Sequence, residues 1–72
     1  SQKWRTLTML EAVTKYLDLD FERQSETQLK QLLNQNEIEL IGQFTRGKAL
    51  FALFDKLVAP QLIEPTWIID YP

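Results

Sequence analysis

Neither cysteine nor histidine occurs in this sequence, and each absence excludes a class of chemistry. Without cysteine the chain forms no disulfide and offers no thiolate, and without histidine it lacks the commonest general base and the commonest metal ligand. Most catalytic constellations are thereby excluded. The 72 residues allow one domain at most, or a piece of a larger protein. Because a domain of this size buries only about 60% of its unfolded surface, we expect marginal stability.

Excess charge and long apolar runs are also lacking. Eight basic and ten acidic residues give a net charge of −2, which indicates no strongly charged partner. The basic residues are scattered among acidic ones and form no nucleic-acid patch: Lys3, Arg5, Lys15, Arg23, Lys30, Arg46, Lys48 and Lys56. Residues 49–54, the longest apolar run, are too few to span a bilayer, and residues 1–3 lack the order of a signal peptide. We therefore expect a cytoplasmic protein with no membrane partner.

Two capping boxes mark the first two helices. In Thr8-x-x-Glu11 and Ser25-x-x-Gln28, the first and last side chains satisfy each other's free backbone N–H groups. The first helix carries one apolar stripe, which ends at residues 18–20: Met9, Ala12, Val13, Tyr16 and Leu17. The second helix has a narrow apolar edge of Leu29, Leu32 and Leu33 and ends near residues 34–36.

The third helix is the most strongly predicted, with Thr45 as its N-cap and Pro60 as its limit. Its apolar face is broad enough to need two packing neighbours: Leu50, Leu53, Phe54, Leu57 and Val58, widened by Phe51 and Ala52. The preceding residues 38–41 fit a short strand or an irregular connection equally well.

The C-terminal run TWIIDYP, residues 66–72, is rich in β-branched and aromatic residues. Its successive apolar side chains are typical of a strand that is covered on both faces. No upstream segment indicates a sheet that would pair with it. We therefore predict a strand cut from its sheet, with hydrogen-bonding edges that would be adhesive if exposed.

The stretch GQFTRGKA, residues 42–49, comes within one residue of the phosphate-binding pattern G-x-x-x-x-G-K-[ST]. Gly42, Gly47 and Lys48 are in place. However, Ala49 stands where a magnesium-binding hydroxyl is needed, and residues 44–46 are bulkier than such a loop favours. We favour a connection into a helix over a phosphate cradle.

Asp18-Leu19-Asp20 has the D-x-D spacing with which a calcium loop begins. Gln24 and Leu29 then occupy positions where an acceptor and a bidentate glutamate are required, and no glycine makes the turn. This run is therefore interpreted as a solvated connection between helices. Trp4 and Trp67 are interpreted as packing anchors and not as base-stacking platforms.

Two segments resemble class II lysyl-tRNA synthetases. Residues 4–12 (WRTLTMLEA) resemble the segment that opens the insertion after the second class-defining motif. Residues 47–72 (GKALFALFDKLVAPQLIEPTWIIDYP) are similar to the helix that closes this insertion and to the strand I-x-P-T-[FW]-I-x-D-Y-P. The resemblance covers nearly all of the chain and is weakest over residues 21–45. It implies that residues 1–72 are a single fragment from between the second and third class II motifs.

The resemblance implies a mainly α fold, a small bundle of about three helices with a C-terminal β-strand that belongs to a larger antiparallel sheet. Residues 8–58 would form a helical insertion beside the active site, and residues 66–71 a strand of the class II catalytic sheet. Lysyl-tRNA synthetases use ATP and magnesium to activate lysine, which they transfer to tRNA, usually as homodimers.

No class-defining motif lies within this chain, so the resemblance assigns it no catalytic, cofactor-binding or metal-binding residue. We expect the isolated segment to be inactive and to bind neither ATP nor magnesium. The insertion would act either as a lid over the active site or as a stabilising element of the sheet.

Two other functions also fit the sequence. A related ligase attaches lysine to a translation elongation factor and shares this scaffold, although residues 62–72 favour the tRNA enzyme. A free-standing helical interaction module would use the broad face of the third helix and the adhesive terminal strand to bind a partner. Two isolated segments would pair or exchange their C-terminal strands to form a dimer.

Overall fold

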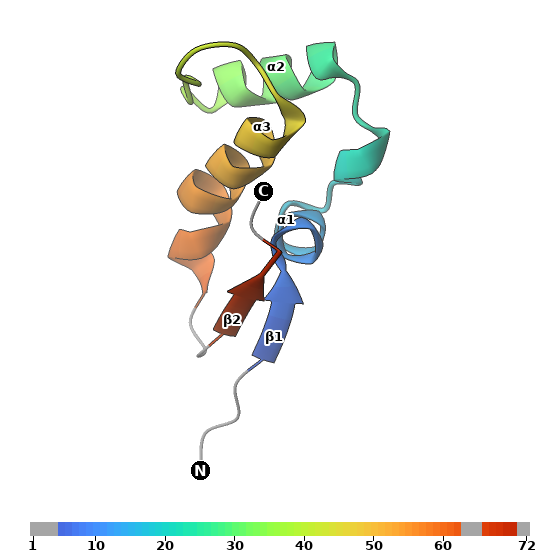
Figure 1. Cartoon of the computed structure of the whole chain (residues 1–72), viewed down its shortest axis with the longest axis vertical. Coiled ribbons are helices and arrows are strands. Elements are labelled where there is room, and N and C mark those ends of the chain that lie inside the picture. The colour runs from blue at the N-terminus through green and yellow to red at the C-terminus, as the bar shows by residue number, and fades with distance from the viewer. Residues whose placement is uncertain (1–4, 63–65, 71–72) are drawn as a thin grey trace.

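The computed structural model describes residues 5–62 and 66–70. The small β-sheet lies at one end of the molecule and α2 at the other (Figure 1). The prediction of a mainly α fold with three helices and a C-terminal strand is confirmed. The elements follow in the order β1 (Arg5–Thr8), α1 (Met9–Leu17), η1 (Phe21–Arg23), α2 (Glu26–Gln35), α3 (Arg46–Leu53), η2 (Phe54–Val58), η3 (Ala59–Gln61) and β2 (Thr66–Ile69).

Both predicted capping boxes are present. The Thr8 hydroxyl accepts from the Glu11 backbone N–H and the Glu11 carboxylate accepts from the Thr8 backbone N–H, each at 2.9 Å. Ser25 and Gln28 make the same exchange at 2.8 and 3.1 Å. At the other end of α1, Asp18 adopts a left-handed conformation with φ of 51°. The starts and ends of α1 and α2 therefore agree with the sequence signals.

A hydrophobic core forms where the three helices meet, and α3 packs against both α1 and α2 as predicted. Its buried members are Met9, Ala12, Val13, Phe21, Leu29, Leu33, Ala49, Leu53, Phe54 and Val58. Phe51 was expected to widen the apolar face of α3 but is 44% exposed. At 3.6 residues per turn it lies half a turn away from both Ala49 and Leu53, which face the core.

The C-terminal strand β2 pairs with β1, so the prediction that no upstream segment would pair with it is wrong. The two strands run parallel, with Leu7 opposite Ile68 and Thr8 opposite Ile69. β1 escaped notice because it has only four residues, too few to establish a period, and because Thr8 already signalled a helix cap. Membership of β2 in a larger antiparallel sheet stays a prediction.

A parallel pair of strands needs a long crossover connection, and here that crossover contains every helix. The chain leaves the sheet at Thr8, passes through α1, α2 and α3, and returns to the neighbouring strand at Thr66. Residues 38–41, which fitted a strand or a loop equally well, form no strand. We call residues 9–62 the helical unit.

Candidate functional site

The GQFTRGKA loop is folded around its own lysine. The Lys48 ammonium donates hydrogen bonds to the backbone carbonyls of Ile41 and Gln43, both at 2.9 Å. Between these carbonyls, Gly42 adopts a positive φ of 75°, and the Lys48 Nζ lies 3.3 Å from the place where a Cβ would stand. Thr45 caps α3 as predicted, since its hydroxyl accepts from the Lys48 backbone N–H at 3.1 Å.

This arrangement does not suit a phosphate group or its magnesium ion. A phosphate cradle directs backbone N–H groups toward the anion, whereas two carbonyl oxygens converge here on a cation. Ala49 is fully buried in the core, at the position where a phosphate loop needs a magnesium-binding hydroxyl. The geometry therefore agrees with the interpretation of this stretch as a connection into a helix.

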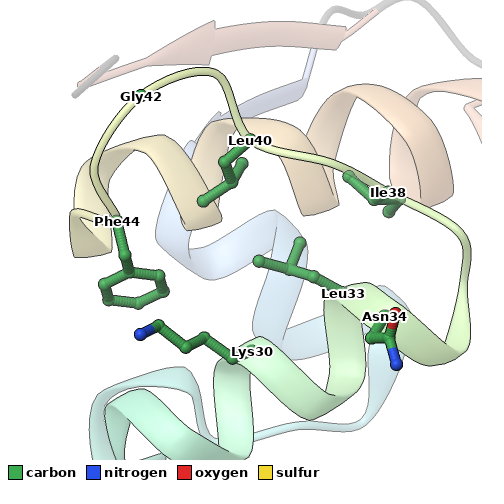
Figure 2. Close-up of a pocket in the computed structure, with 7 residues that line it drawn as sticks. All are labelled: Lys30, Leu33, Asn34, Ile38, Leu40, Gly42 and Phe44. Atoms are coloured by element: carbon green, nitrogen blue, oxygen red, sulfur yellow. The ribbon is translucent and has the colours of Figure 1, made fainter.

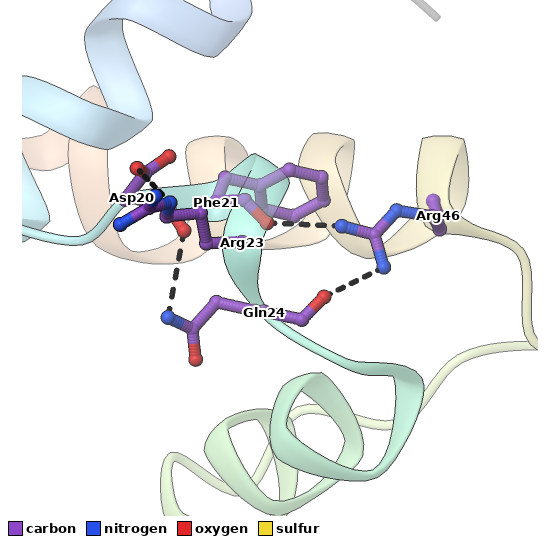
Figure 3. Close-up of polar contacts among 5 residues, drawn as sticks. All are labelled: Asp20, Phe21, Arg23, Gln24 and Arg46. Atoms are coloured by element: carbon purple, nitrogen blue, oxygen red, sulfur yellow. Dashed lines mark hydrogen bonds and ion pairs between the residues drawn. The ribbon is translucent and has the colours of Figure 1, made fainter.

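Arg46 joins two parts of the chain that are distant in sequence (Figure 3). Its guanidinium donates to the carbonyl of Gln24 at 2.8 Å and to that of Phe21 at 2.9 Å. The same group lies over the Phe21 ring, 5.1 Å from the ring centre. The start of α3 is thereby fastened to η1.

Sequence reasoning missed this role of Arg46, which counted only as one of the scattered basic residues. No local pattern marks it, because its partners are main-chain carbonyls 22 and 25 residues away. Carbonyls occur at every position and carry no side-chain signal.

The D-x-D run connects α1 to η1. Asp18 ends α1, and Asp20 forms an exposed ion pair with Arg23 at 3.8 Å. Among residues 5–62 and 66–70, no three acidic side chains come together in a way that could hold a metal ion. The interpretation of this run as a connection between helices agrees with the structure.

A shallow groove of about 290 Å³ lies between α2 and the loop that follows it (Figure 2). The side chains of Leu33, Leu40 and Phe44 point into it. Lys30 lies at its edge, with its ammonium 5.5 Å from the centre of the Phe44 ring. That ammonium also pairs with Glu26 at 2.8 Å. The volume is at the small end of the range for ligand pockets, and the lining includes no acid–base pair.

The exposed apolar side chains indicate contact surfaces and not a catalytic centre. On β2, Trp67 is 60% exposed and Ile69 44% exposed, while the alternate residues Thr66 and Ile68 are partly buried. The accessible face of the small sheet therefore carries two apolar side chains on β2, next to Thr6 and Thr8 of β1. A second exposed pair, Ile41 and Phe51, belongs to the helical unit. Within the part of the chain that the structure describes, no helix is long and apolar enough to cross a membrane.

Comparison with known proteins confirms the resemblance to lysyl-tRNA synthetases. The chain is 39% identical over 71 residues to a lysine–tRNA ligase of Sulfolobus acidocaldarius, a match that covers 97% of this chain. It is 37% identical over 70 residues to one of Saccharolobus solfataricus and 34% identical over 73 residues to one of Clostridium novyi, each covering 96% of this chain. No protein-family model matches.

The same matches cover only 14% of each of these relatives. The chain therefore corresponds in sequence to one segment of a lysyl-tRNA synthetase.

Proposed function

We propose that this chain, which corresponds to a segment of a lysyl-tRNA synthetase, is a non-catalytic helical insertion beside the active site of such an enzyme. The insertion lies between the second and third class II motifs, and β2 continues into the catalytic sheet. The parent enzyme activates lysine with ATP and magnesium in the cytoplasm, transfers the lysine to tRNA, and acts as a homodimer.

The direct pairing of β1 with β2 is the observation that supports an insertion most strongly. The helical unit leaves one strand and returns to the strand beside it, so it can be accommodated without interrupting the sheet. The exposed Trp67 and Ile69 side chains then face other parts of the parent chain.

The two cations of the GQFTRGKA stretch are used within the segment itself, which supports a non-catalytic role. Lys48 and Arg46 both donate to main-chain carbonyls, and each thereby holds a connection between helices in place. The groups that contact lysine, ATP and magnesium are therefore proposed to lie elsewhere in the parent enzyme.

The insertion acts as a lid or positioning element in this proposal. The helical unit has its own hydrophobic core and is connected to the sheet at its two ends, where Leu7 of β1 and Ile68 of β2 pack against that core. In this proposal it moves as one body over the active site. Closure of such a body over an active site excludes water and fixes the reactants.

Deletion of the helical unit from the parent enzyme tests this role. Because β1 and β2 are parallel, residues 9–62 must be replaced by a flexible linker of about a dozen residues and not by a tight turn. We expect lysine-dependent ATP–pyrophosphate exchange to fall by about tenfold or more, since the closing body is lost. Unchanged exchange would refute the lid.

Two controls accompany this deletion. Thermal unfolding of the deletion variant separates a lost lid from a collapsed catalytic domain. An assay of the undeleted enzyme with tRNA and with a translation elongation factor as acceptors separates the tRNA ligase from its elongation-factor relative. Transfer to the elongation factor alone would overturn the proposed substrate.

A further inference from the structure

Ile41 is held outward by the loop that surrounds it. Its side chain is 93% exposed, the highest value among the large exposed hydrophobic residues that the structure describes. Its backbone is nevertheless fixed, because its carbonyl accepts a hydrogen bond from Lys48 and the next residue, Gly42, occupies a left-handed conformation. Lys48 gives up rotamer freedom to make this contact. The loop therefore presents an isoleucine in a preset position.

The exposed isoleucine is part of a wider apolar surface. Leu40, Ile41, Phe51 and Ala52 lie together in a shallow depression whose rim carries Glu39, Lys48 and Asp55. We call these seven residues the Ile41 surface. A single exposed apolar residue is ordinary, but a contiguous apolar patch with a polar rim is typical of a protein contact.

The charges of the Ile41 surface restrict what can cover it. The Lys48 ammonium is held by two carbonyls, and the Asp55 carboxylate pairs with the neighbouring Lys56 at 3.8 Å, so the positive and negative charges here are balanced. A surface without excess positive charge offers no net attraction to the phosphates of a nucleic acid.

We propose that the Ile41 surface docks on another part of the parent ligase, against an apolar depression with a polar rim. This inference rests on the proposed function, because it requires a longer chain, and the matched relatives are about seven times as long as the segment. The surface combines the loop that follows α2 with residues of α3 and η2, and this loop lies at the α2 end of the molecule, away from β1 and β2 (Figure 1). This contact holds the helical unit when it is closed over the active site.

Cysteine alkylation of the full-length parent enzyme tests this docking. The segment contains no cysteine, so Ile41→Cys and the control Gln31→Cys, on an exposed position of α2, each introduce one new thiol into it. The enzyme without either substitution supplies the background from cysteines elsewhere. The measurement is the rate of maleimide labelling in the folded enzyme, with lysine and ATP present so that the helical unit is closed, divided by the rate after denaturation.

We expect the thiol at position 41 to be labelled at least about tenfold more slowly than the thiol at position 31, because reaction then requires local opening of the contact. Equal rates at the two positions would overturn the proposal. Protection that disappears on dilution of the enzyme would also overturn it, since the contact would then be with a second copy.

A second pair of variants tests the docking without introducing a thiol, in case the cysteine substitution disturbs folding. Ile41→Asp should lower the thermal midpoint of the full-length enzyme while Gln31→Asp leaves it unchanged, and equal midpoints would count against docking. Lysine-dependent ATP–pyrophosphate exchange is measured on the unsubstituted enzyme. Its absence would refute the proposed function and would leave the labelling result to decide the docking separately.

Discussion

Replacement of Arg46 by alanine should destabilise the 72-residue chain by about 1–2 kcal/mol. Two charge-assisted hydrogen bonds are lost, one to the exposed carbonyl of Gln24 and one to the partly buried carbonyl of Phe21. Hydrogen bonds to charged groups contribute about 1.5–3 kcal/mol when they are well buried. Water competes for the exposed bond and, in part, for the partly buried one, so the two together contribute about 1 kcal/mol. Stacking over the Phe21 ring adds about 0.5 kcal/mol at such an accessible position.

Urea unfolding followed by circular dichroism measures this loss. With a slope of about 1 kcal/mol per molar urea for a chain of this size, the midpoint should fall by about 1–2 M. The matched control is Arg23→Ala, which removes an exposed ion pair of 3.8 Å and should change stability by less than about 0.5 kcal/mol. Arg46→Lys keeps the charge but loses the forked guanidinium that reaches two carbonyls. Its urea midpoint should therefore lie between those of Arg46→Ala and Arg23→Ala. An Arg46→Ala midpoint equal to that of the control would refute the reasoning.

Three further substitutions test the core, a helix cap and the loop. Leu53→Ala removes a fully buried side chain and should cost about 2–5 kcal/mol, enough to unfold much of the chain, as circular dichroism would show. Thr8→Ala removes half of a capping box and should cost about 1 kcal/mol, measured by urea unfolding against Thr27→Ala on the exposed side of α2. Lys48→Met leaves the carbonyls of Ile41 and Gln43 to water, so the loop should be cleaved faster by protease. The free energy of unfolding, measured in urea, should fall by less than about 1 kcal/mol. Unchanged cleavage would contradict the role given to Lys48.

The helices could be predicted because their signals are local. The capping boxes at Thr8 and Ser25 place donor and acceptor three residues apart, so the sequence itself contains both partners. The apolar stripes follow the helical repeat for the same reason. The inward position of Ala49 and the outward position of Phe51 are finer details, which depend on how α3 is rotated against α1 and α2.

The contacts that organise the whole molecule could not be predicted, because they join distant residues through the main chain. β1 pairs with β2 across the entire helical unit, and Arg46 reaches carbonyls more than twenty residues away. Lys48 had a misleading local context, since its place in a near-match to a phosphate loop suggested an anion partner. Its actual partners are the carbonyls of its own loop.

The small sheet should be the least stable part of the isolated chain. β1 and β2 have four residues each and pair only with one another among the described residues, and a pair of strands this short is marginal in water. The helical unit, by contrast, contains all ten buried core residues. In hydrogen exchange of the isolated chain, we therefore expect the amides of β1 and β2 to exchange at least about tenfold faster than those of core residues such as Val13 and Leu53.

In the full-length parent, where the proposal places β2 in a larger sheet, the same strand amides should become as slow as the core amides. Strands that are already as protected as Leu53 in the isolated chain at low concentration would contradict this expectation, because the two strands would then need no further partner. Protection that grows with concentration would instead indicate that two segments pair through β2, the dimer expected from its adhesive edge.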